Sequence, residues 1–264
     1  MKLTILGTGS AAVTKCYNTC FAFSNNNKHF LIDAGGGNQI LKILSDNDIK
    51  ITDIHDIFIT HSHTDHILGV VWVIRMIGQN INAEKYIGDV NIYGHDEAIH
   101  SIKTICELTL PKKITKHFGN QIKFITVSDG ETVNIMGNDI TFFDILSTKT
   151  KQYGFIMDYN NKKLVCCGDE PLNEKLFDKV KGCDWIMHEA FCLYGERDIF
   201  KPYEKHHSTV KEACETAQIL GVPNLILYHT EDKNINKNEL YTSEGKEFYN
   251  GNIVVPNDND IIVI

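Results

Sequence analysis

The residues best suited to chemistry stand together in one short segment, His61-Ser62-His63-Thr64-Asp65-His66. Its three imidazoles and one carboxylate are the nitrogen and oxygen ligands that zinc and similar borderline metals prefer. Because side chains alternate along an extended segment, His61 and His63 should point the same way and share one metal ion. Asp65 and His66 follow a turn of the chain, so they can reach a second ion nearby.

Strand ends position these residues and others like them. The hydrophobic run Ile57–Ile59 leads straight into the histidine segment, which disfavours the alternative of a solvated histidine-rich loop. Asp169 follows the predicted strand Leu164–Cys167, and His229 ends the predicted strand Leu225–Tyr228. Taken alone, each of these two side chains is more typical of a cap or core position than of a metal ligand.

Short strands separated by loops, with a few helices, make up the rest of the predicted structure. Helices are expected at Asn38–Asp46, Ile67–Ile77, Lys175–Val180 and Thr209–Leu220. Further strands are expected at Leu3–Leu6, Thr19–Ser24, His29–Asp33, Ile57–Thr60, Val90–Tyr93, Ile122–Val127, Asp139–Leu146, Gly154–Tyr159 and Lys163–Cys167. This order predicts an α/β fold of packed sheets covered by helices, with the chemical residues gathered where strands end.

Length and composition indicate a globular protein. The chain has 264 residues, of which 42% are hydrophobic and 23% charged, so a sizeable core is expected and global disorder is not. One α/β domain of this length is ordinary, and we predict a single domain over residues 1–264. The net charge of -8 gives no general attraction for a polyanion, which argues against long nucleic acids as substrates.

The cysteines and the start of the chain indicate a compartment. The first residues, Met1–Ala12, pass from one lysine straight into a predicted strand and a glycine turn. No apolar run is long enough for a signal sequence or a membrane span. In that context the 8 cysteines are expected to be reduced and mostly buried, and the protein to be cytoplasmic without membrane contact.

The glycine turn near the start imitates a dinucleotide-binding fingerprint. Gly7–Ala12 reads G-x-G-x-x-A after a strand, and Asp33 follows at about the spacing of a ribose-binding acid. That mechanism needs a helix to open at the turn, so that its N-terminus faces the pyrophosphate. Val13–Phe23 is instead rich in β-branched and aromatic residues, so a structural glycine turn is the better interpretation.

The histidine segment matches the HxHxDH signature of the metallo-β-lactamase superfamily, which this sequence resembles over almost its whole length. Within the superfamily it is most similar to the ribonuclease Z group. That group's motifs occur here in the family's order: LGTGSA at Leu6–Ala11, DAGGG at Asp33–Gly37, THSHTDH at Thr60–His66, GDE at Gly168–Glu170, HEAF at His188–Phe191, HST at His207–Thr209 and LILYH at Leu225–His229. The resemblance implies a four-layer αββα sandwich and a metal-dependent hydrolase.

The resemblance also implies a dinuclear metal site, with zinc as the expected metal and manganese or iron as alternatives. The implied ligands are four residues of the histidine segment and two at strand ends. They are His61 and His63 for metal one, Asp65, His66 and His229 for metal two, and Asp169 as the bridge between both ions.

A phosphodiesterase or nuclease mechanism follows from the HEAF and HST motifs of the same family. A metal-bound hydroxide would attack phosphorus, His207 would act as general acid toward the leaving oxygen, and Glu189 would orient its ring. Asp65, His207 and Glu189 are therefore the predicted catalytic residues. His207 also precedes Ser208-Thr209, which can cap the next helix and fix the backbone.

One ligand of the family pattern is missing. The family has a further histidine for metal one shortly before the glycine that corresponds to Gly154, and Thr148 falls closest to that position. A hydroxyl is a much poorer ligand than imidazole, so metal one could bind weakly, be completed by water or Asp144, or be absent. Lys149 would bring positive charge close to the site and could contact an anionic substrate.

A second departure concerns the substrate. Ribonuclease Z enzymes carry a protruding arm that grips tRNA, but Thr148–Asp169 has room only for two strands and a turn. With the acidic charge, this argues against pre-tRNA and favours a phosphodiester or another small anionic substrate. The alternatives are a lactone or thioester hydrolase of the same fold, and a non-catalytic metal-binding protein. The resemblance also suggests a homodimer.

Overall fold

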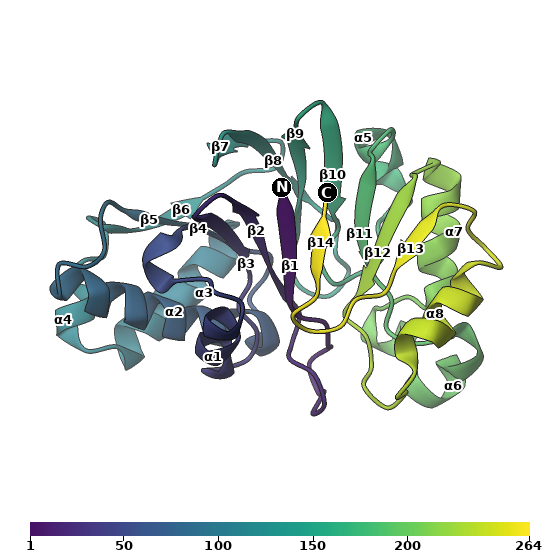
Figure 1. Ribbon diagram of the computed structural model, residues 1–264, viewed down its shortest axis with the longest axis horizontal. Helices are drawn as coiled ribbons and strands as arrows, with labels where there is room; N and C mark the ends of the chain where they lie inside the picture. The colour runs from purple at the N-terminus through teal and green to yellow at the C-terminus, as the bar shows by residue number, and fades with distance from the viewer. The chain divides into compact units, whose positions relative to one another are not determined.

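The computed structural model describes all 264 residues, and the chain forms two compact units. Unit 1 comprises residues 1–7, 17–128 and 258–264, and unit 2 comprises residues 8–16 and 129–257. Each unit is built on its own 7-stranded sheet with its own helices (Figure 1). No helix in the structure is both long and apolar enough to cross a membrane.

The sheet of unit 1 runs in the order β14-β1-β2-β3-β4-β5-β6. Its first half is antiparallel, and β3 to β6 are parallel. Parallel neighbours need crossovers, and helices supply them here. The strands are β1 (Lys2–Gly7), β2 (Cys20–Asn25), β3 (Lys28–Ile32), β4 (Ile54–Ile59), β5 (Val90–Gly94), β6 (Ile122–Thr126) and β14 (Ile261–Val263). The helices are α1 (Gln39–Asp46), η1 (Ile51–Asp53), α2 (Thr64–Asn82), α3 (Asp96–Thr109) and α4 (Lys112–Thr115).

Helix α2 matters most for the site because it begins inside the histidine segment. Its buried face, which includes Val70, Ile74 and Ile77, packs on β4 residues such as Ile57 in the core of unit 1. Gly69 allows the close approach of this helix to the loop after β3, since a Cβ there would lie 1.7 Å from the carbonyl oxygen of Ala34. The first turn of α2 is thereby held against the end of β3.

The sheet of unit 2 runs in the order β13-β12-β11-β10-β9-β8-β7, with β10 to β13 parallel and the rest antiparallel. Helices α7 and α8 lie along β12 and β13 (Figure 1). The strands are β7 (Thr132–Ile135), β8 (Asn138–Asp144), β9 (Tyr153–Tyr159), β10 (Lys162–Cys166), β11 (Trp185–Glu189), β12 (Asn224–Tyr228) and β13 (Asn252–Val254). The helices are η2 (Glu174–Leu176), α5 (Phe177–Val180), η3 (Tyr194–Glu196), α6 (Arg197–Phe200), η4 (Tyr203–Lys205), α7 (Val210–Leu220) and α8 (Lys237–Gly245).

The predicted α/β fold is confirmed, and each of the predicted strands and helices overlaps an observed one. The sequence prediction missed the α-helices α3, α4, α6 and α8 and the strands β7, β11, β13 and β14. Helix α3 had a readable signal, because Ala98, Ile99, Ile102 and Cys106 recur with helical spacing and are buried. Strand β11 is buried on both faces, and such strands are expected to be continuously hydrophobic. It was not predicted because it ends in two polar residues, His188 and Glu189.

The glycine turn near the start has a structural role. No helix opens there, and the first helix of the chain is α1. Instead the turn pairs with the residue after His229. The Thr230 amide donates to the carbonyl of Thr8, and the Ser10 amide donates to the carbonyl of Thr230, both at 3.0 Å. The dinucleotide interpretation is therefore excluded on the geometry it requires.

Candidate metal centre

The histidine segment wraps around the start of α2 in unit 1. His61 and His63 precede the helix, with His63 extended at the N-cap, and Asp65 and His66 lie in its first turn. The extended backbone before the helix agrees with the sequence prediction, whereas the helix begins at Thr64 rather than at the predicted Ile67 and so contains Asp65 and His66. His61, Asp65 and His66 are buried, and His63 is half-buried.

The side chains of this segment converge within unit 1. Nε2 of His61 lies 2.9 Å from Nδ1 of His63, and the rings of His61 and His66 have centroids 4.1 Å apart. Nε2 of His66 lies 3.4 Å from a carboxylate oxygen of Asp65. Three imidazoles and a carboxylate gathered this closely are a donor set for a borderline divalent metal.

Asp33 and Thr60 hold two of these rings from behind. One oxygen of Asp33 accepts from the Thr60 hydroxyl at 2.7 Å and from Nδ1 of His66 at 2.8 Å. Because the Thr60 hydroxyl donates to Asp33, it accepts from Nδ1 of His61, 2.9 Å away. Both histidines thus carry their proton on Nδ1, which leaves Nε2 as the nitrogen with a lone pair, the state of a metal ligand.

The role of Asp33 was not predicted from the sequence, where this residue appeared in the DAGGG motif and in the rejected dinucleotide motif but was assigned no contact with the histidines. Its backbone lies in the left-handed region at φ 53°, and its second oxygen accepts from the Thr60 amide at 2.9 Å. A left-handed aspartate that ends a strand just before Gly35 is unusual. The signal available in the sequence was the place of this aspartate, at the end of a predicted strand and two residues before Gly35.

Unit 2 gathers a second group. Asp169 follows β10 after the left-handed Gly168, and His229 follows β12 with φ 57°. Nε2 of His229 lies 3.6 Å from a carboxylate oxygen of Asp169. The Tyr228 hydroxyl donates to the carbonyl oxygen of Gly168. These contacts place an imidazole and a carboxylate together at the ends of two strands, and both are ligand types that a zinc site uses.

Lys237 supports the residue after His229. This lysine is buried, and its ammonium donates to the hydroxyl of Thr230 at 2.7 Å. The same ammonium lies 3.5 Å from the hydroxyl of Thr8. A buried amine costs solvation unless it is hydrogen-bonded, so these contacts tie the glycine turn to the segment that carries His229.

His207 lies beside this second group. Its ring stacks on Phe191 with centroids 5.0 Å apart and an interplanar angle of 6°. Nδ1 of His207 donates to the backbone carbonyl of Asp169 at 2.8 Å. Burial lowers the pKa of His207, and the charges of Lys149 and Lys205 lower it further, whereas Asp169 opposes the shift. Lys149, predicted to bring positive charge close to the site, therefore acts on the His207 ring.

Glu189 does not hold the ring of His207 in the way the sequence predicted. Its nearer oxygen is 3.7 Å from Nδ1 of His207, too far for a hydrogen bond. The other oxygen accepts from the Ser208 amide at 2.6 Å. Burial raises the pKa of Glu189 well above its ordinary value. The carboxyl therefore fixes the backbone next to His207, and the Asp169 carbonyl orients the ring.

The position of the missing histidine is occupied by an exposed hydroxyl. The amide of Thr148 donates to the buried carboxylate of Glu170 at 3.1 Å, which also accepts from Ser147 at 2.6 Å. The hydroxyl of Thr148 lies 2.6 Å from Nδ1 of His206. The loop is thus well anchored, and the hydroxyl at this position contacts a histidine from a distant turn of the chain.

The region between Thr148 and Asp169 contains no protruding arm. Strands β9 and β10 fill it and are joined by a turn through Asn160 and Asn161, both with positive φ. The sequence prediction for this segment is confirmed.

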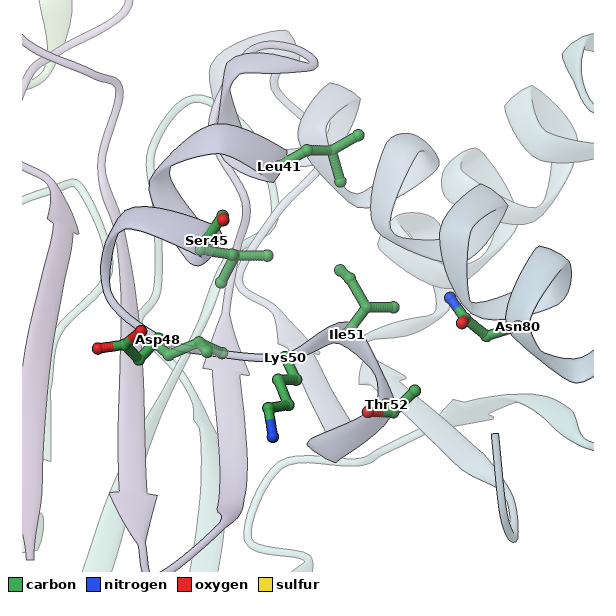
Figure 2. Close-up of a pocket in the computed structure, with 9 residues that line it drawn as sticks. Leu41, Ser45, Asp48, Lys50, Ile51, Thr52 and Asn80 are labelled. Atoms are coloured by element: carbon green, nitrogen blue, oxygen red, sulfur yellow. The ribbon is translucent and has the colours of Figure 1, made fainter. Parts of the chain in front are cut away.

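A cavity elsewhere in unit 1 does not belong to the site. Figure 2 shows it between α1, η1 and the end of α2, with Lys50 and Asp48 pointing in different directions. Asn80 lines this cavity, whereas the histidine segment lies at Thr64. Sixteen helical residues separate those ends, or about 24 Å. The cavity therefore holds no converging polar groups that could act with the histidines.

Solved structures share this fold over the whole chain. The metallo-β-lactamase fold protein YhfI from Bacillus subtilis superposes with a TM-score of 0.80 at 17% identity, covering 99% of this chain and 98% of that one. The short form of human tRNase Z gives 0.76 at 20% identity, covering 100% and 99%. Zn(2+)-bound PqqB from Methylobacterium extorquens gives 0.75 at 14% identity, covering 100% of both chains. The metallo-β-lactamase fold predicted from the sequence is confirmed.

Proteins of similar sequence identify the class of this protein more closely. Ribonuclease Z of Methanococcus aeolicus is 27% identical over 313 aligned positions, covering 100% of this chain and 94% of that protein. The chain is therefore a metallo-β-lactamase-fold hydrolase of the ribonuclease Z-like branch. More particularly, a family model described as Anti-Pycsar protein Apyc1 matches residues 1–248, and the chain belongs to that family.

Proposed function

We propose that this protein is a dinuclear metal phosphodiesterase that acts on small phosphodiesters. The observation that carries the proposal is the pair of contacts behind the histidine segment, from Thr60 to His61 and from Asp33 to His66. Both contacts fix the proton on Nδ1, and a histidine core or cap has no need for that shared arrangement.

The two groups of residues are proposed to act together as one site. His61, His63 and Asp169 would hold one metal ion, and Asp65, His66, His229 and the same Asp169 would hold the second. Zinc is the first choice because the set combines imidazole nitrogens with carboxylate oxygens, and manganese or iron are alternatives. When bound, such metals lower the pKa of water toward neutrality and so supply a nucleophile at neutral pH.

His207 is proposed to exchange a proton with the leaving oxygen. Its Nδ1 proton is held by the Asp169 carbonyl, so Nε2 is the nitrogen that can serve the substrate. Phe191 stacks on the ring and the Asp169 carbonyl accepts from Nδ1, so two contacts fix the ring, while Glu189 holds the backbone amide of the next residue, Ser208. A phosphodiester anion next to this histidine would favour its protonated form and offset the effect of burial.

The proposed substrate is small. The ribonuclease Z relatives favour phosphodiester chemistry. Strands β9 and β10 are joined by a short turn, so this segment contains no arm that could bind a folded RNA. Two other functions remain as competing hypotheses. One is hydrolysis of a lactone or a thioester in the same fold, and the other is metal binding without catalysis.

Turnover assays test the proposal against both competitors. The purified protein, loaded with zinc or manganese, is given bis(p-nitrophenyl) phosphate, a pre-tRNA with a 3′ trailer, an acyl-homoserine lactone and a thioester. We expect turnover of the small phosphodiester, with the pre-tRNA, the lactone and the thioester cleaved at least about 100-fold more slowly per unit kcat/KM. Faster lactone or thioester cleavage would assign the site to carboxyl chemistry, and no turnover with metals bound would favour the non-catalytic function.

A further inference from the structure

Gln152 is a fully buried polar residue of unit 2 that contacts the backbone of a candidate metal ligand. It is 0% exposed, although glutamine is ordinarily a surface residue. Its side-chain oxygen accepts from the backbone amide of Asp169 at 3.3 Å, and its side-chain nitrogen donates to Oε1 of Glu170 at 3.3 Å. Because a backbone N–H can only donate, the oxygen of Gln152 must be the atom that faces Asp169.

The backbone on both sides of Asp169 is held by hydrogen bonds from three separate segments. The Tyr228 hydroxyl donates to the carbonyl of Gly168, Gln152 accepts from the amide of Asp169, and His207 donates to the Asp169 carbonyl at 2.8 Å. Gly168 is left-handed at φ 79°, and a Cβ there would lie 3.0 Å from Oε1 of Gln152. The side chain of Gln152 therefore lies directly against the turn that carries Asp169.

The other end of the Gln152 side chain is fixed by Glu170. This carboxylate is buried, and three donors converge on it: the Ser147 hydroxyl at 2.6 Å, the Thr148 amide at 3.1 Å and the nitrogen of Gln152. Gln152 thus connects Asp169 to the loop in which Thr148 replaces the histidine of the family pattern. The connection consists entirely of buried or part-buried hydrogen bonds, which are costly to leave unmade.

The residue type at position 152 matches both contacts. Glutamine has an acceptor and a donor on one planar group, so it can serve a backbone amide and a carboxylate together. Methionine has a similar length but lacks both groups. Glutamate would keep the acceptor for Asp169 but would turn a second carboxylate toward Glu170. The contacts of Gln152 therefore depend on the amide itself and not on the volume of the side chain.

We propose that Gln152 is a positioning residue of the metal site, which acts by fixing the backbone at Asp169 before a metal ion binds. The proposal rests on the part of the proposed function in which Asp169 binds metal. Without the contact from Gln152, the turn at Asp169 must be ordered when the ion binds, and that ordering reduces affinity. Groups that orient a ligand in this way typically change metal affinity by about 10- to 100-fold.

Metal affinity of the full-length protein tests the proposal without turnover. Gln152→Met should bind zinc about 10- to 100-fold more weakly than wild type, measured by competition with a chromogenic chelator. Tyr249→Phe is the matched control, because it removes another buried hydrogen bond of unit 2, from the Tyr249 hydroxyl to the Val222 carbonyl at 2.6 Å. Val222 precedes β12, whereas His229 follows it, so this control lies at the opposite end of the strand. Tyr249→Phe should keep the affinity of wild type.

Hydrogen exchange in the metal-free protein tests the contact itself. The amide of Asp169 should exchange about 2- to 10-fold faster in Gln152→Met than in Tyr249→Phe, which is the value of one hydrogen bond. NMR of the labelled proteins measures this rate. A residue that only fills space in the core would leave both the exchange rate and the zinc affinity unchanged.

A double variant shows whether the amide is what matters. Gln152→Glu combined with Glu170→Gln exchanges donor and acceptor while the net charge stays the same. Its zinc affinity should be within about threefold of wild type, because the exchange restores the coupled pair. A double variant as weak as Gln152→Met, wild-type affinity in Gln152→Met, or an equal fall in Tyr249→Phe would overturn the proposal. Failure of the phosphodiesterase function would show instead as zinc-loaded wild type without turnover, while these affinities still follow Gln152.

Discussion

The histidine segment of unit 1 and the Asp169 group of unit 2 both bring candidate metal donors together, but they do so by different structural means. In unit 1 the donors are contiguous in sequence, and a helix start arranges them. In unit 2 the donors Asp169 and His229 are far apart in sequence and meet because β10 and β12 end at the same edge of one sheet. The contrast shows why the first group was readable from spacing and the second was readable only through the family pattern.

The two groups also differ in what surrounds them. A buried carboxylate, Asp33, holds the rings of unit 1 in the tautomer that a metal needs. In unit 2 the proposed proton donor, His207, and a cavity of about 530 Å³ lie beside Asp169. Under the proposed function, unit 1 would therefore contribute most to metal affinity, and unit 2 would contribute the proton transfer.

Removal of a unit 1 ligand should have the largest effect. His61→Ala deletes a buried donor nitrogen, so we expect loss of bound metal and a fall in kcat of at least about 10³-fold. Elemental analysis and phosphodiester turnover measure the two effects. His100→Ala, an exposed histidine of α3, is the matched control and should retain both. Full activity in His61→Ala would contradict the assignment of the histidine segment as metal ligands.

Removal of His207 should separate proton transfer from metal binding. His207→Ala should keep its metal but lose about 10²–10⁴-fold in kcat on a phosphodiester with an alcohol leaving group. The loss should be smaller with a nitrophenolate leaving group, which needs less protonation. Equal losses with both leaving groups, or loss of metal together with activity, would show that His207 does something other than proton transfer.

The residue behind the ligands should have an intermediate effect. Asn tolerates the left-handed backbone of position 33, so Asp33→Asn changes the carboxylate without straining the chain. We expect metal affinity to fall about 10- to 100-fold, measured by competition with a chromogenic chelator. Asp46→Asn, at an exposed ion pair in α1, is the control. Unchanged affinity in Asp33→Asn would remove the observation on which the proposed function depends.

Most of the fold was predictable because alternation and helical spacing are local signals. The HxHxDH residues were predictable for the same reason. Asp33 was not, since its role depends on β3 and α2 meeting in space. The partner of Thr148 was not predictable either, because His206 reaches it only through a left-handed turn far along the chain. Contacts between segments that are distant in the chain leave no pattern in the spacing of residues along the sequence.

The smallest effect concerns stability. His188 is buried and neutral, accepting from the Leu172 amide and donating to the Glu189 carbonyl, and burial lowers its pKa below 6.5. A histidine with a lowered folded pKa stabilises the fold above the unfolded value, and this contribution is lost as the pH falls through the folded pKa. The loss builds up between the unfolded and the folded pKa with a slope of at most about 1.4 kcal/mol per pH unit, and below the folded pKa it stops growing.

Urea unfolding of the metal-free protein at pH 7.5 and pH 5.5 measures this effect. Wild type should lose more stability between these pH values than His188→Gln, which cannot gain the proton. Identical losses in the two proteins would mean that protonation of His188 does not contribute to the pH dependence of stability.

Anomalous diffraction at the zinc edge from crystals of the zinc-loaded protein tests the central claim most directly. The account predicts two peaks per chain, one contacted by His61, His63 and Asp169 and the other by Asp65, His66, Asp169 and His229. A single peak would reduce the site to one metal, consistent with the lost histidine at Thr148. Zinc held by residues of only one unit, or no zinc at all, would contradict the account.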